Sequence, residues 1–342
     1  IAVVNGGRES IAHELRTREG ITGVVSTQNI VSFGGAVQQG IAAVPSDPSP
    51  ISREQAGGAE TTSHAEQTQD WFWLLSEDSA PEPRALAEIL STVQRAPSVA
   101  IAGPKLLSWD HPDRIIELGQ SLTHRGERWL LRRQERDQQQ YDHLQDVLGV
   151  GPVGMLVRSD VWRQLEGFDP AYAVYDDGLD LSVRARLAGF RVVVAPTSRV
   201  RFAQLGVAGP RIERSRRVMR TAHREARTAQ LHRRIAYAPA IAAFFRWLGL
   251  PLLAVLRVAW ALIREQPGNM WGEFSSALKV FFTPGSVVAS RRRVRDANSS
   301  GWGAVKPLRV DPKTVRTARM IDREAILVSQ GRLRDELHFI SS

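Results

Sequence analysis

The sequence predicts an α/β fold with a mixed, largely parallel sheet, followed by amphipathic helices associated with a membrane. Three observations support this prediction: short apolar runs rich in β-branched and aromatic residues, helical segments between them, and a sharp change of composition after Phe202. Runs that are apolar on both faces are typical of strands covered by helices on both sides. Their alternation with helices is typical of an α/β domain.

The apolar runs predict six strands in the first 200 residues, at 1–4, 21–25, 71–75, 99–107, 154–157 and 191–195. Helices are expected between them, at 10–18, 33–44, 81–95, 159–165 and 179–188. Pro81 is expected to begin its helix, because the first helical position does not need the N–H that proline lacks. Gly189 is expected to end its helix in a left-handed conformation.

Composition divides the chain of 342 residues into four segments. An α/β domain is expected over 1–205, with 45–69 as a mobile surface loop or a simple tolerated insertion, since that stretch has almost no large apolar residue. A basic helical linker over 206–234 and apolar, membrane-associated helices over 235–290 follow, and a basic tail occupies 291–342.

The apolar stretch 235–263 is long enough to cross a bilayer, which takes about 20 residues. Pro239 and Pro251 interrupt it, and arginines at the depth of the bilayer are costly. If one helix continued through Pro251, three arginines would share a face, as in a helix that lies in the membrane interface: Arg246, Arg257 and Arg264. Interfacial helices are therefore favoured, and a membrane span or a core helix pair of a soluble domain are the alternatives.

The net charge of +9 comes almost entirely from arginine, because only four of the 45 basic residues are lysine. An anionic membrane surface suits the cluster that follows the apolar segment: Arg291, Arg292, Arg293 and Arg295. A solvated basic face is the alternative. Nucleic acid is not an expected partner, because the arginines lie beside apolar residues and not among exposed stacking aromatics. The chain has no cysteine, which excludes disulfides, thiolate metal sites and cysteine nucleophiles.

Two acidic groups are candidates for chemistry. Ser76, Glu77 and Asp78 follow an apolar run, and ligands of open α/β sheets gather at the carboxyl ends of strands. A carboxylate there can hold a hard cation that also binds a substrate pyrophosphate, although Ser76 or Asp78 could instead be a plain helix cap.

The second group contains Asp176, Asp177 and Asp180. Three carboxylates in five residues repel one another, which raises at least one pKa toward the range of a general base. Asp180 and Arg184 are four residues apart on a helix and can pair. Asp176 or Asp177 is therefore the freer candidate.

The order of these motifs resembles family 2 glycosyltransferases of the GT-A fold, in particular the large membrane-associated actinobacterial members. The resemblance covers roughly residues 1–205 and rests on four stretches: Asn29 with 33–37, the run 71–83, the acidic run 137–142 with Asp146 and Val147, and 151–201. It also implies one further strand ahead of the segment 1–7.

The resemblance implies transfer of a sugar from a nucleotide-diphosphate donor to a cell-envelope glycan or lipid-linked acceptor, at the cytoplasmic face of the membrane, with Mg²⁺ or Mn²⁺. Asp78 falls on the metal-binding position, and Asp177, with Asp176 and Asp180 beside it, falls on the motif that supplies the base. The positions that correspond to donor binding are Asn5, Asn29, Gly34, Gly35, Glu77, Gly151 and Gly154.

Three positions depart from the family pattern. Ser76 stands where a first metal-binding aspartate is common, Gly178 where a second acid of the base motif is usual, and Phe202 where a metal-ligating histidine often occurs. These departures leave a second interpretation open: a GT-A domain without catalytic activity that serves as a scaffold or glycan-binding module in envelope assembly.

Overall fold

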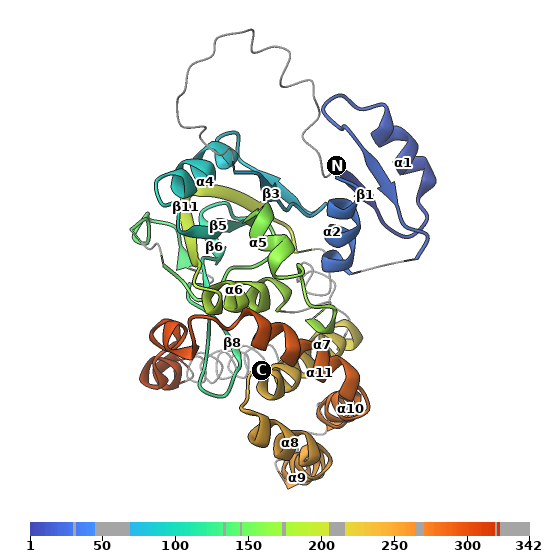
Figure 1. Ribbon diagram of the computed structural model, residues 1–342, viewed down its shortest axis with the longest axis vertical. Coiled ribbons are helices and arrows are strands. Elements are labelled where there is room, and N and C mark those ends of the chain that lie inside the picture. The colour runs from blue at the N-terminus through green and yellow to red at the C-terminus, as the bar shows by residue number, and fades with distance from the viewer. Residues whose placement is uncertain are drawn as a thin grey trace, which may run out of the picture.

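The computed structural model describes residues 1–29, 32–44, 69–132, 135–143, 146–172, 176–204, 216–263, 270–318 and 320–321. An N-terminal αβ unit lies beside a sheet with its covering helices, and a group of C-terminal helices packs below them (Figure 1). The expected mobile loop at 45–69 falls outside the described residues apart from its last position.

The main sheet has seven described strands: five in the order β3-β10-β5-β11-β4, β6 paired with β5, and β9 paired with β6. Its longest pair, β5 and β11, is parallel, and the other pairings within this sheet are antiparallel. The strands are β3 (Trp71–Trp73), β4 (Ser79–Pro81), β5 (Val99–Ser108), β6 (Arg114–Glu117), β9 (Glu135–Arg136), β10 (Leu156–Arg158) and β11 (Arg191–Phe202). The predicted α/β fold with a mixed sheet is confirmed.

Two smaller sheets complete the strands. β1 (Ala2–Val4) and β2 (Val24–Ser26) pair in parallel, as expected for strands joined by a helix, here α1 (Glu9–Arg16). β7 (Gln120–Leu122) and β8 (Arg128–Leu130) form an antiparallel hairpin.

The helices of the α/β region are α2 (Phe33–Ala42), α4 (Ala85–Gln94), α5 (Ser159–Gln164) and α6 (Asp177–Leu187), with a short 3-10 turn, η1, at Pro170–Tyr172. Helix α6 is buried along its whole length. Gly189 follows it with a φ of 91°, which confirms the expected left-handed end of the helix.

The expected start of a helix at Pro81 is wrong. Pro81 is the last residue of β4 and pairs with Val200, and the helix begins only at Ala85. β4 lies at the end of the strand order, and an edge strand tolerates a residue that has no N–H to donate. Proline is tolerated both in an edge strand and at the first position of a helix, and the pairing of β4 with β11 decided between the two.

The C-terminal helices form a second core of their own. They are α7 (Arg216–Ala236), α8 (Ala240–Leu248), α9 (Leu250–Ile263), α10 (Met270–Phe281) and α11 (Pro284–Ala297). Leu231, Ile235, Leu250, Ala254 and Val280 are buried together in this core. Within the described residues, no helix has both the length and the apolar character needed to cross a membrane.

The apolar segment does not form one continuous helix, because α8 ends at Leu248 and α9 begins at Leu250. The condition for a shared arginine face is therefore not met, and the side chains of Arg257 and Arg264 lie outside the described residues. Helices α8 and α9 nevertheless expose seven large apolar side chains: Ile241, Phe244, Phe245, Leu248, Leu252, Val255 and Leu256. We call these residues the α8–α9 apolar surface.

Two arginines of the basic cluster are engaged inside the protein. Arg291 donates to the carbonyls of Ile235 and Ala238, beyond the last turn of α7. Arg293 pairs with Glu166 and with the buried Asp169. Arg292 and Arg295 are exposed, so only this half of the cluster can face a membrane surface.

Candidate active site

Asp177 is the first residue of α6, and its carboxyl group is buried. Removal from water raises the pKa of this carboxyl group to about 7, and the neighbouring charge of Asp176 adds to the rise. A backbone N–H donated by Gly178 to Oδ1 at 2.8 Å and the positive charge of Arg128 oppose it. A carboxyl group with a pKa near 7 can accept a proton at neutral pH, as a general base must.

The other two carboxylates of this group are paired with basic or hydroxyl partners. Asp176 has a left-handed φ of 72° and accepts a hydrogen bond from Arg233 Nη1 at 2.7 Å. Asp180 accepts from Arg184 Nε at 2.7 Å, as expected for residues four apart on a helix, and from the Tyr237 hydroxyl at 2.8 Å. Arg233 lies in the last turn of α7 and Tyr237 directly follows that helix, so this part of the chain binds Asp176 and Asp180 but not Asp177.

Asp177 lines a small cavity of about 60 Å³. The residues around it are Ser32, Gly34, Gly35, Gln38, Phe168, Asp169, Pro170 and Asp177. A Cβ atom on Gly34 would lie 3.4 Å from Asp177 Oδ2 and 3.2 Å from the Phe168 ring, so glycine lets α2 approach the acid closely. The fold therefore brings together two predicted donor-binding glycines and the predicted base.

The structure gives a physical reason for Gly178. A Cβ atom at this position would lie 2.7 Å from the Val150 carbonyl oxygen and 2.8 Å from the Pro152 nitrogen. Both contacts are with backbone atoms, which cannot rotate away. An acid therefore cannot occupy this position without moving the segment 150–152, and Asp177 is the acid that reaches the cavity.

Gly151 and Gly154, predicted near the donor, lie on that same segment. The Gly151 N–H donates to Glu117 Oε1 at 2.8 Å, and Gln120 Nε2 donates to the same atom at 2.9 Å. Gly154 has a φ of 73° and accepts a hydrogen bond from the Trp73 indole, which ties it to the end of β3. The segment is thus fixed on two sides.

Sequence reasoning missed Glu117, Arg128 and Arg233. Burial raises the pKa of Glu117, while the charge of Arg128 lowers it. These three residues come from β6, β8 and α7, and they meet around Asp176 and Gly151 only through the tertiary fold. No local spacing in the sequence signals this meeting.

Asp78 lies in the turn between β3 and β4. The Ser76 hydroxyl donates to Asp78 Oδ1 at 2.6 Å, and the Ala203 N–H donates to the Asp78 carbonyl at 2.9 Å. Ser79 pairs with Phe202 in the register of β4 and β11. The position that often holds a histidine in this family is therefore adjacent to Asp78, and here it supplies no metal donor.

The described residues contain no group of three or more His, Asp or Glu side chains that could hold a metal ion. Asp78 and Ser76 supply a carboxylate and a hydroxyl oxygen, which are hard donors. Mg²⁺ commonly takes one or two carboxylates and completes its shell with waters and substrate phosphates. The donor set therefore fits a divalent cation that arrives with a diphosphate. The predicted Glu77 is exposed beside it.

The two predicted donor-binding asparagines meet around Thr27. The Thr27 hydroxyl lies 3.0 Å from Asn5 Oδ1 and donates to the Asn29 carbonyl at 2.9 Å. Asn5 follows β1 and Thr27 follows β2, so both lie at the carboxyl ends of parallel strands, where ligands of α/β sheets gather.

The acidic run 137–142 and Asp146 have structural roles. The buried Lys105 donates to Asp137 and Asp142, both at 2.8 Å. Asp146 pairs with Arg186 and Arg191, which lowers the pKa of its carboxyl group. These pairs tie the segment before the glycines to β5, α6 and β11.

Comparisons with known proteins identify the family of this chain. The chain is similar to a solved structure titled "Crystal structure of GalNAc-T7 with UDP, GalNAc and Mn2+". The match covers 70% of this chain and 45% of that chain, with 10% sequence identity and a TM-score of 0.40. The match thus spans less than half of that protein. A search of curated proteins found no match. The sequence pattern of the family described as "Glycosyltransferase like family 2" matches residues 1–237. The chain belongs to glycosyltransferase family 2 and has the GT-A fold of nucleotide-sugar transferases.

Proposed function

We propose that this protein is an active, metal-assisted glycosyltransferase in which Asp177 is the general base and Asp78 binds the metal ion. The observation that carries the proposal is the cavity shared by Asp177, Gly34 and Gly35. It holds one buried carboxyl group with a pKa of about 7, while the neighbouring acids are neutralised by partners.

In the proposed reaction, an acceptor hydroxyl oxygen attacks the anomeric carbon of the donor sugar. The bond from that carbon to the diphosphate oxygen breaks, and the nucleoside diphosphate leaves with the bonding electrons. Asp177 Oδ2 takes the proton of the attacking hydroxyl, so the carboxyl group is neutral at the end of the step and passes the proton to water. Burial keeps water from competing for this role.

Asp78, with Ser76 beside it, would hold Mg²⁺ or Mn²⁺ against the donor diphosphate. The cation would neutralise the charge that develops on the leaving group. The first turn of α2 begins at the Asp177 cavity, and the positive end of a helix dipole favours a diphosphate there. Asn5 and Asn29 are placed to bind the rest of the donor.

For the acceptor we propose a cell-envelope glycan or a lipid-linked sugar, reached at the cytoplasmic face of the membrane. The α8–α9 apolar surface supports this part of the proposal. Phe244 is 56% exposed and Phe245 is 64% exposed, on a helix whose opposite side contributes Ala243 to the core. Exposed aromatic and aliphatic side chains on one helical face, with Arg246 among them, are typical of a helix in the membrane interface.

The catalytic proposal is tested by donor turnover and donor binding with and without Mn²⁺. Asp78→Ala should abolish metal-dependent donor binding, whereas Asp110→Ala, which removes an exposed aspartate elsewhere, should leave it unchanged. Turnover without divalent metal, or an unchanged rate in Asp78→Ala, would contradict the proposal. Absence of any nucleotide-sugar binding would instead favour the scaffold interpretation.

The membrane proposal is tested by sedimentation with vesicles. Wild-type protein should bind vesicles that contain phosphatidylglycerol more strongly than vesicles of phosphatidylcholine alone. The double substitution Phe244→Asp/Phe245→Asp should reduce binding at least tenfold, and Ile11→Asp on α1 should not. Equal binding by both variants would remove the α8–α9 apolar surface as the contact.

A further inference from the structure

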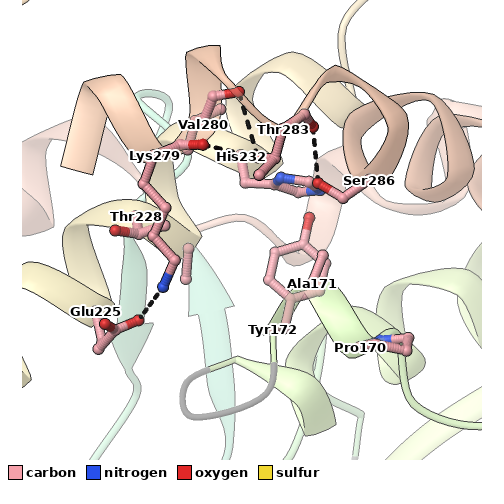
Figure 2. A pocket seen from close by; sticks show the side chains of 11 residues that line it. Pro170, Ala171, Tyr172, Glu225, Thr228, His232, Lys279, Val280, Thr283 and Ser286 are labelled. Atoms are coloured by element: carbon pink, nitrogen blue, oxygen red, sulfur yellow. Dashed lines mark hydrogen bonds and ion pairs between the residues drawn. The ribbon is translucent and has the colours of Figure 1, made fainter. Parts of the chain in front are cut away.

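A second, larger cavity of about 310 Å³ lies among the C-terminal helices, and no step of the proposed reaction uses it. It is enclosed by η1, α7, α10 and α11 (Figure 2). Pro170 lines this cavity and also the Asp177 cavity, so the two lie on either side of one short turn. Its volume is at the lower end of the range for small-molecule sites.

Tyr172 provides the first sign that this cavity holds a ligand. Its side chain is 1% exposed, and its hydroxyl has no hydrogen-bond partner among the described residues. Figure 2 shows the hydroxyl directed toward Ser286 and the ring of His232. A buried hydroxyl without a partner costs about 1–3 kcal/mol, which an oxygen atom of a bound molecule would recover.

Three hydroxyl groups across the cavity from Tyr172 can accept hydrogen bonds but have no proton left to donate. Thr228 donates to the Arg224 carbonyl, Thr283 to the Lys279 carbonyl, and Ser286 to the Thr283 carbonyl. Each hydroxyl has a single proton, and each proton is already donated to a nearby backbone carbonyl. Their lone pairs therefore remain to accept hydrogen bonds from a ligand.

The cavity has no net charge to offer. Lys279 Nζ and Glu225 Oε2 are 2.9 Å apart and neutralise each other at its edge. Burial lowers the pKa of His232, whose ring also lies edge-to-face against Tyr172 at 5.3 Å. Among the described residues that line the cavity, a phosphate, a carboxylate or a metal ion would therefore find no charged side chain without a partner of opposite charge. Figure 2 shows the Lys279–Glu225 pair on one side of the cavity and Tyr172 on the other.

We infer that this cavity is a subsite for a neutral sugar ring. The hydroxyl groups of a sugar ring both donate and accept hydrogen bonds, so they can pair with the Tyr172 hydroxyl as donor and with the three threonine and serine oxygens as acceptors. The apolar C–H faces of the ring can pack against Tyr172, Val280 and Ala229. The inference rests on the proposed function, because we take the sugar ring to be part of the acceptor glycan. The ring is held beside η1 while another unit of the same glycan reaches Asp177.

The test is saturation-transfer NMR of the whole protein with free uncharged sugars, namely D-glucose, D-galactose, D-mannose and D-arabinose. At least one should bind at millimolar concentration, and Tyr172→Phe should weaken that binding about five- to twentyfold. Thr228→Val, on the opposite wall, should weaken it similarly. Tyr141→Phe, which removes a phenol hydroxyl bonded elsewhere to Glu135, should have no effect. Glucose 6-phosphate should not compete.

Binding of the nucleotide-sugar donor with Mn²⁺ is measured in the same variants and should not change. If no neutral sugar binds, or if both Tyr172→Phe and Thr228→Val bind it as wild type does, the inference is wrong even when donor turnover is intact. If a neutral sugar binds through Tyr172 while no donor binds, the subsite stands and the proposed transferase function falls.

Discussion

The two cavities beside Pro170 differ in how the protein treats charge. The smaller one, at the start of α2 and α6, keeps one buried carboxyl group without a basic partner at hydrogen-bond distance. The larger one, among the C-terminal helices, has an ion pair between Lys279 and Glu225 in its lining and presents hydroxyl groups. An uncompensated acid is costly and suits proton transfer, whereas a neutral polar wall suits binding. If both proposals hold, proton transfer and sugar recognition take place in different parts of the chain.

The largest expected effect is on the rate of transfer. Asp177→Asn should lower kcat by about a hundredfold to ten-thousandfold, because general-base catalysis contributes about 10²–10⁴. In the wild-type enzyme kcat should rise about tenfold per pH unit below the pKa of about 7 and level off above it, since the base must be ionised. Steady-state kinetics between pH 5 and pH 9 measure both. A variant with more than a tenth of the wild-type rate would remove Asp177 from the chemistry.

The next effect concerns Arg233, which pairs with Asp176. Arg233→Met should destabilise the protein by up to about 3–5 kcal/mol, because it removes the buried partner of Asp176 and leaves that carboxylate with only the partly exposed Arg128, at 3.4 Å. Arg292→Met, at an exposed pair, should change the free energy of unfolding by less than about 1 kcal/mol. Urea denaturation measures both. Equal values would mean that the Asp176–Arg233 pair does not hold α7 against α6.

A third effect is on the pH dependence of stability, which should differ between Asp177 and a neutral residue at the same position. The folded pKa of about 7 lies above the ordinary value of 3.8, so the carboxyl group costs stability progressively as pH rises from about 4 to about 7. Asp177→Asn should therefore match wild type below pH 4 and be more stable above pH 7, by at most about 4 kcal/mol. Thermal unfolding across this range tests it, and a variant that is less stable at pH 8 would contradict the assigned environment.

The smallest expected effect concerns Gly178, which leaves room for the backbone of the segment 150–152. Gly178→Ala should destabilise the protein by about 1–3 kcal/mol, because the added methyl group meets backbone at 2.7–3.0 Å. Gly285→Ala, in α11 with nothing within 4 Å, should instead stabilise it by about 0.5–1 kcal/mol. Opposite signs in thermal unfolding would support the close approach, and a stabilising Gly178→Ala would refute it.

Much of the fold followed from local patterns. The predicted strands near 1–4, 71–75, 99–107 and 191–195 and the left-handed Gly189 follow from burial periodicity and glycine geometry, which depend on neighbouring residues. Pro81 was misjudged, because an edge strand and a helix start accept proline equally well. The motif order also indicated family 2 membership before any geometry was available, and the family comparison confirms it.

The sequence alone placed Asp177 in a crowded acidic group, named Asp78 as the metal position and set Gly34 and Gly35 among the donor residues. The residue pattern set Asp180 aside as a partner of Arg184, but it did not choose between Asp176 and Asp177, because that choice depends on Arg233, which reaches Asp176 from 57 residues away along the chain. Pairing, burial and cavity shape are properties of contacts between distant segments. Periodicity and motif order depend on residues that are adjacent in the chain, so the sequence alone determined them. The ionisation of the site depends on contacts between distant segments, so only the tertiary structure decided it.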